Sequence, residues 1–247
     1  MTATARRRLA TFDVPPDSRD PQVPRGLVGF TGEWRTALLP ARLLLRAPWL
    51  AQAPRGDGRP TVLLPGWRAP EATMTPLGLY LRGIGHDTRG WGLGVNQGNP
   101  ERDVALMTEV VTALHAGTGR AVALVGWSLG GLVARETARA VPEAVSHVVT
   151  FGTPVVGGPS FTIGAGAYGE VQSRRIRERA EALDRADPIR VPVTAIFTRR
   201  DNVVDWPACL DRTTPGARHV EVRSTHLGMG LDPDVWQTVA DALGARP

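Results

Sequence analysis

The chain contains no lysine: arginine supplies the whole Lys+Arg count of 29, set against 24 Asp and Glu. Its one cysteine, Cys209, excludes an intramolecular disulfide. Most arginines are scattered among acidic residues; clusters occur only at 6–8 and 174–177, and the two tyrosines add few aromatic rings between them. The sequence therefore predicts a solvated basic surface and no nucleic-acid binding.

Long apolar runs are missing as well. No stretch approaches the roughly 20 apolar residues of a transmembrane helix. The arginines at 6–8 are typical of the start of an export signal, but the following residues LATFDVPP lack the apolar region that such a signal needs. We therefore expect a cytoplasmic protein without a membrane span.

With 247 residues, of which 42% are apolar, the chain is large enough for one α/β domain. Short apolar runs alternate with helical patterns from residue 61 onward. Strands are predicted at 61–65, 121–125, 145–151, 193–197 and 219–222, and helices at 76–82, 100–116, 129–140 and 234–243. This alternation is typical of a parallel sheet that is covered by helices on both faces.

Three segments fall outside this alternation. Residues 1–30 are rich in Pro, Asp and Arg and predict a flexible N-terminal arm before a single domain over 31–247. The insertion 155–190 is first Gly-rich and then charged and helical, and its length predicts a lid or cap. The third segment is an apolar helical pattern at 34–50.

This apolar pattern follows a helix start predicted at Thr31 or Gly32. The residues at helical spacing are Trp34, Leu38, Ala41, Leu45 and Trp49, with Leu39, Leu43, Leu44 and Leu50 widening the stripe. Three interpretations stay open: a helix that packs on the domain, one that lies against a lipid surface, or a cover over an active site.

The segment Gly126-Trp127-Ser128-Leu129-Gly130 matches the pattern Gly-x-Ser-x-Gly. It lies between the predicted strand 121–125 and the predicted helix 129–140, the context in which this pattern indicates a nucleophilic serine. A sharp strand-to-helix turn leaves no room for side chains two positions on either side, which explains both glycines. Ser128 is thus the predicted nucleophile. The Leu129 backbone N–H, at the helix N-terminus, is a predicted oxyanion donor.

A serine hydroxyl needs a base, and the base needs an acid to orient it. When the serine follows a strand in this way, the acid and then the histidine come later in the chain. His226, in a loop before the last helix, is favoured as the base over His219, which opens a strand. Asp201, at the turn after the strand 193–197, is favoured as the acid over Asp205, which is also able to cap a helix or to pair with Arg200.

Tryptophans surround this predicted machinery. A second oxyanion donor is expected in the loop after the first core strand, where Trp67 N–H in Pro65-Gly66-Trp67-Arg68 is the best candidate. Trp91 and Trp127 are candidate substrate-binding residues that, with Trp67, would line an apolar acyl pocket. Packing in the core is the alternative for each of them.

These motifs resemble the α/β-hydrolase superfamily, and within it bacterial lipases and esterases. The matching segments are 63–67, 90–96, 125–134, 151–154, 200–206 and 224–230, and the resemblance runs from about residue 30 to the C-terminus. It implies a mostly parallel, eight-stranded sheet flanked by helices, with its first antiparallel strands reduced or absent. It also implies the triad Ser128, Asp201 and His226, and no metal or organic cofactor.

The chain departs from the family pattern at Pro65-Gly66, where lipases often have His-Gly, and its cap segment 155–190 is not assigned to any part of that pattern. The leading hypothesis is a serine esterase or lipase-like enzyme that cleaves carboxylic esters through an acyl-enzyme. Acyl transfer or thioester cleavage by the same triad is an alternative, and so is a non-catalytic binding module on this fold. The expected partner is a small ester or acyl substrate, with a weak lipid-surface contact through residues 34–50.

Overall fold

The computed structural model describes residues 9–24, 36–165 and 170–244. Its centre is a seven-stranded sheet of order β1-β7-β6-β5-β4-β2-β3. The strands are β1 (Thr11–Phe12), β2 (Pro60–Leu64), β3 (Asp87–Gly90), β4 (Val122–Trp127), β5 (Val145–Phe151), β6 (Val193–Phe197) and β7 (Arg218–Glu221). Neighbouring strands are parallel except at β1, which runs antiparallel to β7. The predicted α/β class with a mostly parallel sheet is confirmed.

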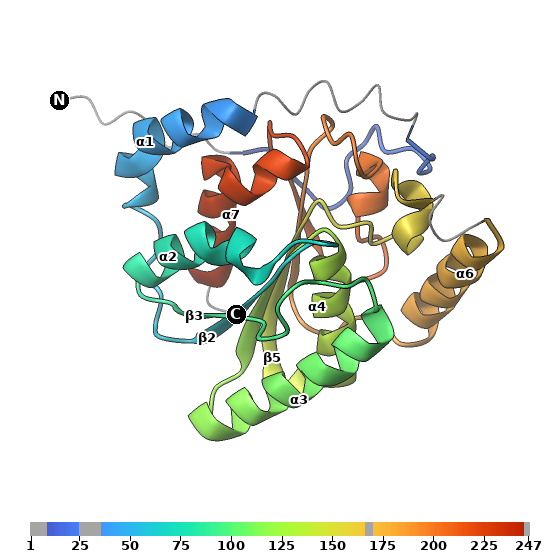
Figure 1. Cartoon of the computed structure of the whole chain (residues 1–247), viewed down its shortest axis with the longest axis horizontal. Helices are drawn as coiled ribbons and strands as arrows, with labels where there is room; N and C mark the ends of the chain where they lie inside the picture. The colour runs from blue at the N-terminus through green and yellow to red at the C-terminus, as the bar shows by residue number, and fades with distance from the viewer. Residues whose placement is uncertain (1–8, 25–35, 166–169, 245–247) are drawn as a thin grey trace.

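The helices lie in two layers. They are α1 (Leu39–Leu50), α2 (Thr75–Gly83), α3 (Pro100–Thr118), α4 (Leu129–Ala140), α6 (Glu170–Ala186) and α7 (Pro233–Gly244). Figure 1 shows α1, α2 and α7 on one side of the sheet and α3, α4 and α6 on the other. At the ends of α3, Asn99 Oδ1 accepts from Arg102 N–H, and Gly119 leaves the helix at φ 67°.

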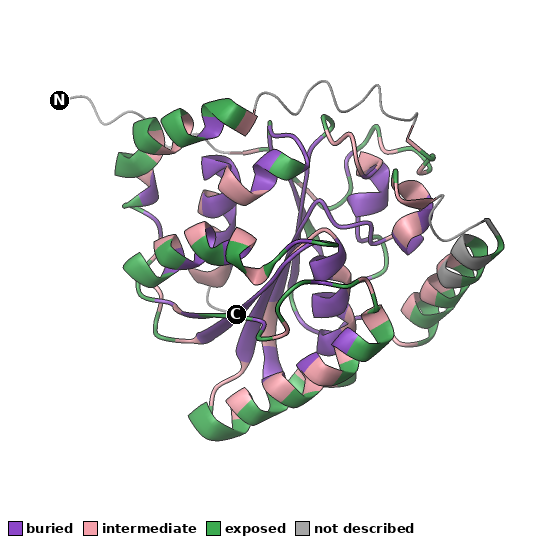
Figure 2. Ribbon diagram, viewed as in Figure 1, coloured by how far each residue is buried: buried purple, intermediate pink, exposed green. Residues whose placement is uncertain are grey.

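Each face of the sheet has its own hydrophobic core, because successive strand residues point to opposite faces. On β4, Val125 packs in the cluster with α2 and α7, whereas its neighbour Leu124 packs in the cluster with α3 and α4. The central strands are consequently buried over most of their length (Figure 2), which is why their sequences are mostly apolar instead of alternating. The polar edge strand β3, Asp-Thr-Arg-Gly, has no such pattern and is absent from the sequence prediction.

Part of the expected flexible arm over 1–30 is instead docked on the domain. Strand β1 pairs with β7, and the guanidinium of Arg19 donates to both carboxylate oxygens of Asp205 at 2.6 and 2.7 Å. Arg19 and Asp205 are 186 positions apart, so the composition of the arm gives no sign of the contact. Residues 1–8 and 25–30 lie outside the described residues.

Helix α1 packs on the domain with a different face from the one that its spacing predicts. The exposed side chains are Leu38, Leu44 and Leu45, at 54%, 79% and 77%. The buried ones are Leu39 and Leu50, toward α7 and the loop before it. The helix is apolar almost all round, so periodicity alone does not select the buried face. Trp34 and the predicted helix start lie outside the described residues.

The insertion 155–190 contains a 3₁₀ turn, η4 (Gly158–Phe161), followed by α6. These two elements contact each other, and Asp184 near the end of α6 accepts hydrogen bonds from Arg135 and Arg139 of α4. The insertion is thus attached to the helix that follows Ser128, while its role as a lid stays a prediction. None of the helices in the described ranges is long and apolar enough to cross a membrane.

Candidate active site

Ser128 lies at the sharp turn from β4 into α4, at the carboxyl edge of the sheet. Its backbone is held at φ 53° and ψ −122°, a region that residues with a side chain rarely adopt. A Cβ at Gly126 would overlap the backbone of Gly131, and one at Gly130 would overlap the carbonyl of Leu64. Both glycines of the motif are therefore required by close packing around the serine turn.

His226 and Asp201 form a buried pair at the same edge. His226 follows β7 and Asp201 follows β6, and the imidazole Nδ1 lies 2.8 Å from Asp201 Oδ2. The side chains are 3% and 0% exposed. Because a carboxylate only accepts hydrogen bonds, Nδ1 carries a proton and Nε2 is left as the basic atom of a neutral imidazole.

The acid of this pair is itself fixed. Asp201 Oδ1 accepts from the backbone N–H groups of Val203 and Val204, at 2.9 and 2.7 Å. These bonds hold the carboxylate so that Oδ2 faces His226. No hydrogen bond joins Ser128 Oγ to His226 in the described part of the chain; such contacts are often long before a substrate binds.

The structure separates the favoured acid and base from their alternatives. Asp205 is occupied by Arg19 and by the backbone N–H of Gln22. His219 is fully buried, and its Nε2 accepts from the backbone N–H of Asp211 at 2.9 Å. Burial also lowers the pKa of His219 below its ordinary value. The arrangement thus pairs Asp201 with His226 and leaves Asp205 and His219 in other contacts.

The imidazole of His226 rests on Gly152, a residue to which sequence reasoning gives no such role. A Cβ at Gly152 would lie 3.0 Å from His226 Nδ1, and the residue has φ 58°, so both space and backbone favour glycine. The ring of Trp127 lies beside the imidazole, with 5.8 Å between centroids. Thr198 Oγ1 donates to Ser224 O at 2.9 Å and ties the histidine loop to the end of β6.

The loop after β2 passes beside Ser128 and contains an amide with no hydrogen-bond partner among the described residues. A Cβ on Gly66 would lie 3.3 Å from the Cβ of Ser128, so this loop runs directly beside the serine. Trp67 N–H has no hydrogen-bond partner within the described residues, whereas Arg68 N–H and Ala69 N–H are both bonded. Leu129 N–H, at the first position of α4, has no partner inside the helix.

The candidate substrate-binding tryptophans differ from one another. Trp91 is 1% exposed in the core with Met107 and Val111, and its Nε1 donates to Gly94 O at 2.9 Å. A substrate-binding role does not fit Trp91, because its ring is enclosed by the core. Trp127 is half-buried between Gly66 and His226, and Trp67 is 39% exposed.

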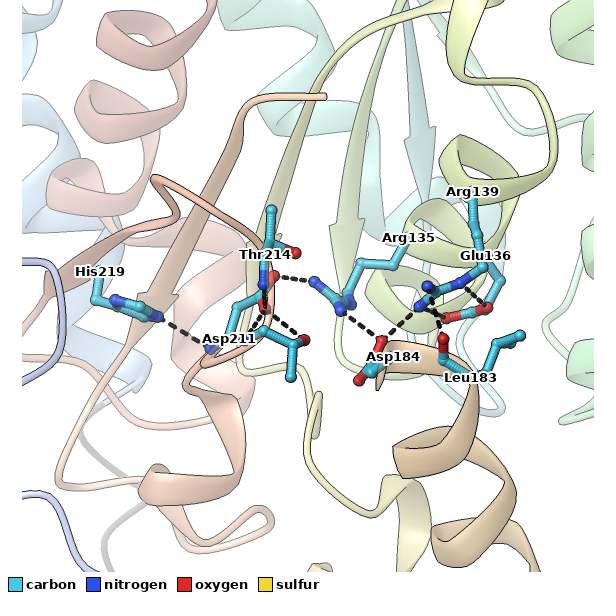
Figure 3. A network of polar contacts seen from close by, with 9 residues as sticks. Arg135, Glu136, Arg139, Leu183, Asp184, Asp211, Thr214 and His219 are labelled. Carbon is cyan, nitrogen blue, oxygen red and sulfur yellow. Dashed lines mark hydrogen bonds and ion pairs between the residues drawn. The ribbon is translucent and has the colours of Figure 1, made fainter. Parts of the chain in front are cut away.

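A second buried ionic group lies on α4, and the sequence gives no sign of it. Arg135, 1% exposed, bonds the carboxylates of Asp211 and Asp184, and Asp184 also accepts from Arg139 (Figure 3). Burial on its own would raise the pKa of Asp211, but the Arg135 guanidinium holds it below its ordinary value. This network joins α4, α6 and the segment before β7.

Metal ligands and the single thiol are the other groups able to carry chemistry. Among residues 9–24, 36–165 and 170–244, no group of three or more His, Cys, Asp or Glu side chains is placed to hold a metal ion. Cys209 is buried, and burial raises the pKa of its thiol well above the ordinary value. A thiol in that state is a poor nucleophile near neutral pH.

No family model matches the chain, but the chain is similar to several curated proteins and solved structures. It is 32% identical over 118 residues to a pimeloyl-[acyl-carrier protein] methyl ester esterase of Aliivibrio fischeri (strain MJ11). This match spans 46% of the chain and 42% of the relative, so it covers less than half of either protein.

Two solved structures share the fold over most of their length. One belongs to work on the metagenome-derived lipolytic enzymes LipS and LipT, with a TM-score of 0.57 at 15% identity over 76% of this chain and 93% of that one. The other is MGS-MChE2, an α/β-hydrolase enzyme from a lagoon-sediment metagenome, with a TM-score of 0.51 at 19% identity over 75% and 90%. With its parallel sheet and its serine turn between β4 and α4, the chain has the α/β-hydrolase fold.

Proposed function

We propose that this protein is a serine hydrolase that cleaves carboxylic esters. The observation that carries the proposal is the buried Asp201–His226 hydrogen bond, at the same sheet edge as Ser128 in its strained turn. A histidine oriented by an acid, at the same sheet edge as a half-buried serine in such a turn, is the arrangement that acyl transfer to serine needs. The Aliivibrio relative, a methyl ester esterase by name, supports the same reaction class.

The proposed reaction proceeds in two halves. Ser128 Oγ attacks the acyl carbon while His226 Nε2 takes its proton, and Asp201 stabilises the imidazolium that forms. The backbone N–H groups of Trp67 and Leu129 bind the developing oxyanion; one such donor is worth about 10²–10³ in kcat. The alcohol leaves with the proton from His226, and water, activated by the same base, then releases the acid from Ser128.

Apolar side chains around these residues support a substrate with an apolar acyl or alcohol part. Trp67, Ile163 and Leu227 are 39%, 41% and 42% exposed. Trp67 follows the loop residue that lies against Ser128, and Leu227 follows His226. Ile163 precedes Gly164, whose Cβ position lies 3.5 Å from the Trp67 ring. The insertion 155–190 thus reaches the proposed substrate side, which supports its role as a cap.

The direct test is labelling of Ser128 by a fluorophosphonate probe. We expect the wild-type protein to react and Ser128→Ala to stay unlabelled. Ser146→Ala is the matched control, because Ser146 lies on β5 and has no part in the proposed reaction. If the wild-type Ser128 does not react, the proposal fails and a non-catalytic binding module is the better interpretation.

Substrate preference is tested separately, with p-nitrophenyl esters of increasing chain length and matched thioesters. We expect faster turnover of esters with an apolar acyl chain than of acetate. Faster cleavage of thioesters, or transfer of the acyl group to an added alcohol in preference to water, would replace ester hydrolysis by the alternative reactions of the same triad.

We further propose a weak lipid-surface contact through α1. The exposed side chains Leu44 and Leu45 of α1, with Leu38 just before the helix, support this contact, whereas Arg42 is already bonded to Asp232. The contact would therefore be apolar more than electrostatic. Leu44→Ser with Leu45→Ser should reduce co-sedimentation with phosphatidylcholine vesicles, and Leu79→Ser on α2, 59% exposed, should not. Equal binding by both variants would contradict the proposal.

A further inference from the structure

Asn96 is a fully buried polar residue in the loop after β3, and its side chain reaches across to the loop after β2. Its Nδ2 donates to Pro65 O at 2.9 Å, 31 positions earlier in the chain. Its Oδ1 accepts from Gly98 N–H at 3.0 Å. Asn96 is 0% exposed, so its carboxamide forms no hydrogen bonds with solvent and depends on these two bonds.

The backbone of Asn96 binds the same loop on its other side. Asn96 O accepts from Arg68 N–H at 2.8 Å, and Asn96 N–H donates to Ala69 O at 3.1 Å. Asn96 therefore forms hydrogen bonds with this loop on both sides of Trp67: at Pro65 before it, and at Arg68 and Ala69 after it. This hydrogen-bonded stretch, residues 65–69, is the one that runs beside Ser128.

These hydrogen bonds hold the loop in a strained backbone conformation. Arg68 has φ 56° and is, with Ser128, one of two non-glycine residues at positive φ in the described part of the chain. Such a backbone persists only where its surroundings over-determine it. The bonds of Arg68 N–H and Ala69 N–H leave Trp67 N–H as the free amide of the turn.

We propose that Asn96 is the positioning residue of the oxyanion loop, holding the peptide that presents Trp67 N–H to the substrate beside Ser128. The inference rests on the proposed ester hydrolysis and adds a residue to it. Asn96 touches no reacting atom; it acts through the geometry of residues 65–69. Its loss should therefore weaken binding of the transition state more than binding of the substrate.

The test is Asn96→Asp, compared with the wild type by steady-state kinetics on a p-nitrophenyl ester. Aspartate has the same size, keeps the acceptor for Gly98 N–H and keeps both backbone bonds. It replaces the donor to Pro65 O with an oxygen, so two acceptors face each other. We expect kcat per active site, counted by fluorophosphonate titration, to fall at least about tenfold, with KM within about threefold; loss of a whole oxyanion donor sets the upper range.

Asn99→Asp is the matched control. It makes the same chemical change three positions along the same loop, where aspartate also caps α3, and kcat should stay within about twofold. If Asn96→Asp does not fold, Asn96→Ala takes its place, because it removes both side-chain bonds without placing a charge in the interior. The same kcat and KM split is expected.

The outcomes separate the two proposals. Labelling of wild-type Ser128 with a tenfold or greater loss of kcat in the Asn96 variant supports the positioning role. Labelling of wild-type Ser128 with a smaller loss, or with a change in KM alone, overturns the role of Asn96 and leaves the esterase proposal standing. Absence of labelling in the wild type overturns both.

Discussion

Two Asp and His sets lie in the last fifty residues of the chain, and they are built in opposite ways. In the first, the Asp201 carboxylate faces His226 Nδ1. In the second, Asp211 offers its backbone N–H to His219 Nε2 and turns its carboxylate to Arg135 (Figure 3). All four side chains are buried or nearly so, so burial does not distinguish the sets.

The difference lies in which atom of the imidazole is used. An acid on Nδ1 leaves the His226 Nε2 free to take a proton and offers charge to balance the imidazolium. A backbone donor on Nε2 uses the basic atom of His219, and the acid that could balance a charge is committed to an arginine. The first set is arranged for proton transfer and the second for holding the chain together.

The largest expected effect separates the two histidines. His226→Ala should lower kcat by on the order of 10⁶-fold, since serine and base act as one unit. His219→Ala should keep most of the turnover per folded molecule, because its imidazole bonds only the backbone. Ester turnover normalised to folded protein measures both, and the reverse result would make His219 the base.

The two acids should differ by a smaller factor. Asp201→Asn keeps the shape of the side chain but favours the wrong tautomer of His226, and kcat should fall about 10⁴-fold. Asp211→Asn should leave kcat per folded molecule within about twofold. Comparable losses of kcat in the two variants would show that the Asp211 set also serves the reaction.

In the free energy of unfolding, we expect the larger effect from the Asp211 variant and not from the Asp201 variant. Asp211→Asn leaves Arg135 buried with one of its carboxylate partners gone, which should cost about 3 kcal/mol in the free energy of unfolding. Urea unfolding followed by tryptophan fluorescence measures this loss. An unchanged midpoint would indicate that Asp184 alone satisfies Arg135.

The smallest effect concerns acid sensitivity of the fold. Burial, with Arg218 and Arg59 nearby, lowers the pKa of His147 from 6.5 to about 4. Below pH 6.5 the unfolded chain binds this proton and the folded one does not, so stability falls as pH drops from 6.5 toward 4. His147 should account for about 2 kcal/mol between pH 7.5 and pH 5.

The control for that prediction is His147→Gln, which keeps a partner for Thr194 Oγ1 and does not titrate. Its free energy of unfolding should depend less on pH than that of the wild type, by that amount. If urea midpoints of the two proteins fall in parallel on acidification, the neutral state of His147 is not a source of acid sensitivity.

The sequence predicts the parts of the fold whose signals are local. Residues 129–140, 145–151 and 193–197 have the predicted bounds, because two mostly apolar strands and a Gly-bounded turn before an amphipathic helix leave few alternatives. The Asp201–His226 contact is predictable from the sequence because the acid and then the histidine come after Ser128 in the chain, each in a loop that follows a strand. The variants above test its catalytic role.

What the sequence misses depends on distant contacts. Arg135 and Asp211 are 76 positions apart, and neither has a neighbour that marks it as buried. The role proposed for Asn96 depends on its hydrogen bonds with Pro65, Arg68 and Ala69, which lie in a different loop. The buried face of α1 is decided by what α7 and the histidine loop offer, because its own sequence is apolar on most sides.

The short strand β1 has a consequence for how copies of the chain meet. A sheet that ended at β7 would present a row of unpaired amides and carbonyls, on which another strand can grow. Thr11–Phe12 pair with Val220 and His219 in that row, and a strand of two residues offers little template for a further strand in turn. Loss of this cover would leave the atoms of the site in place and give fibril growth a place to begin.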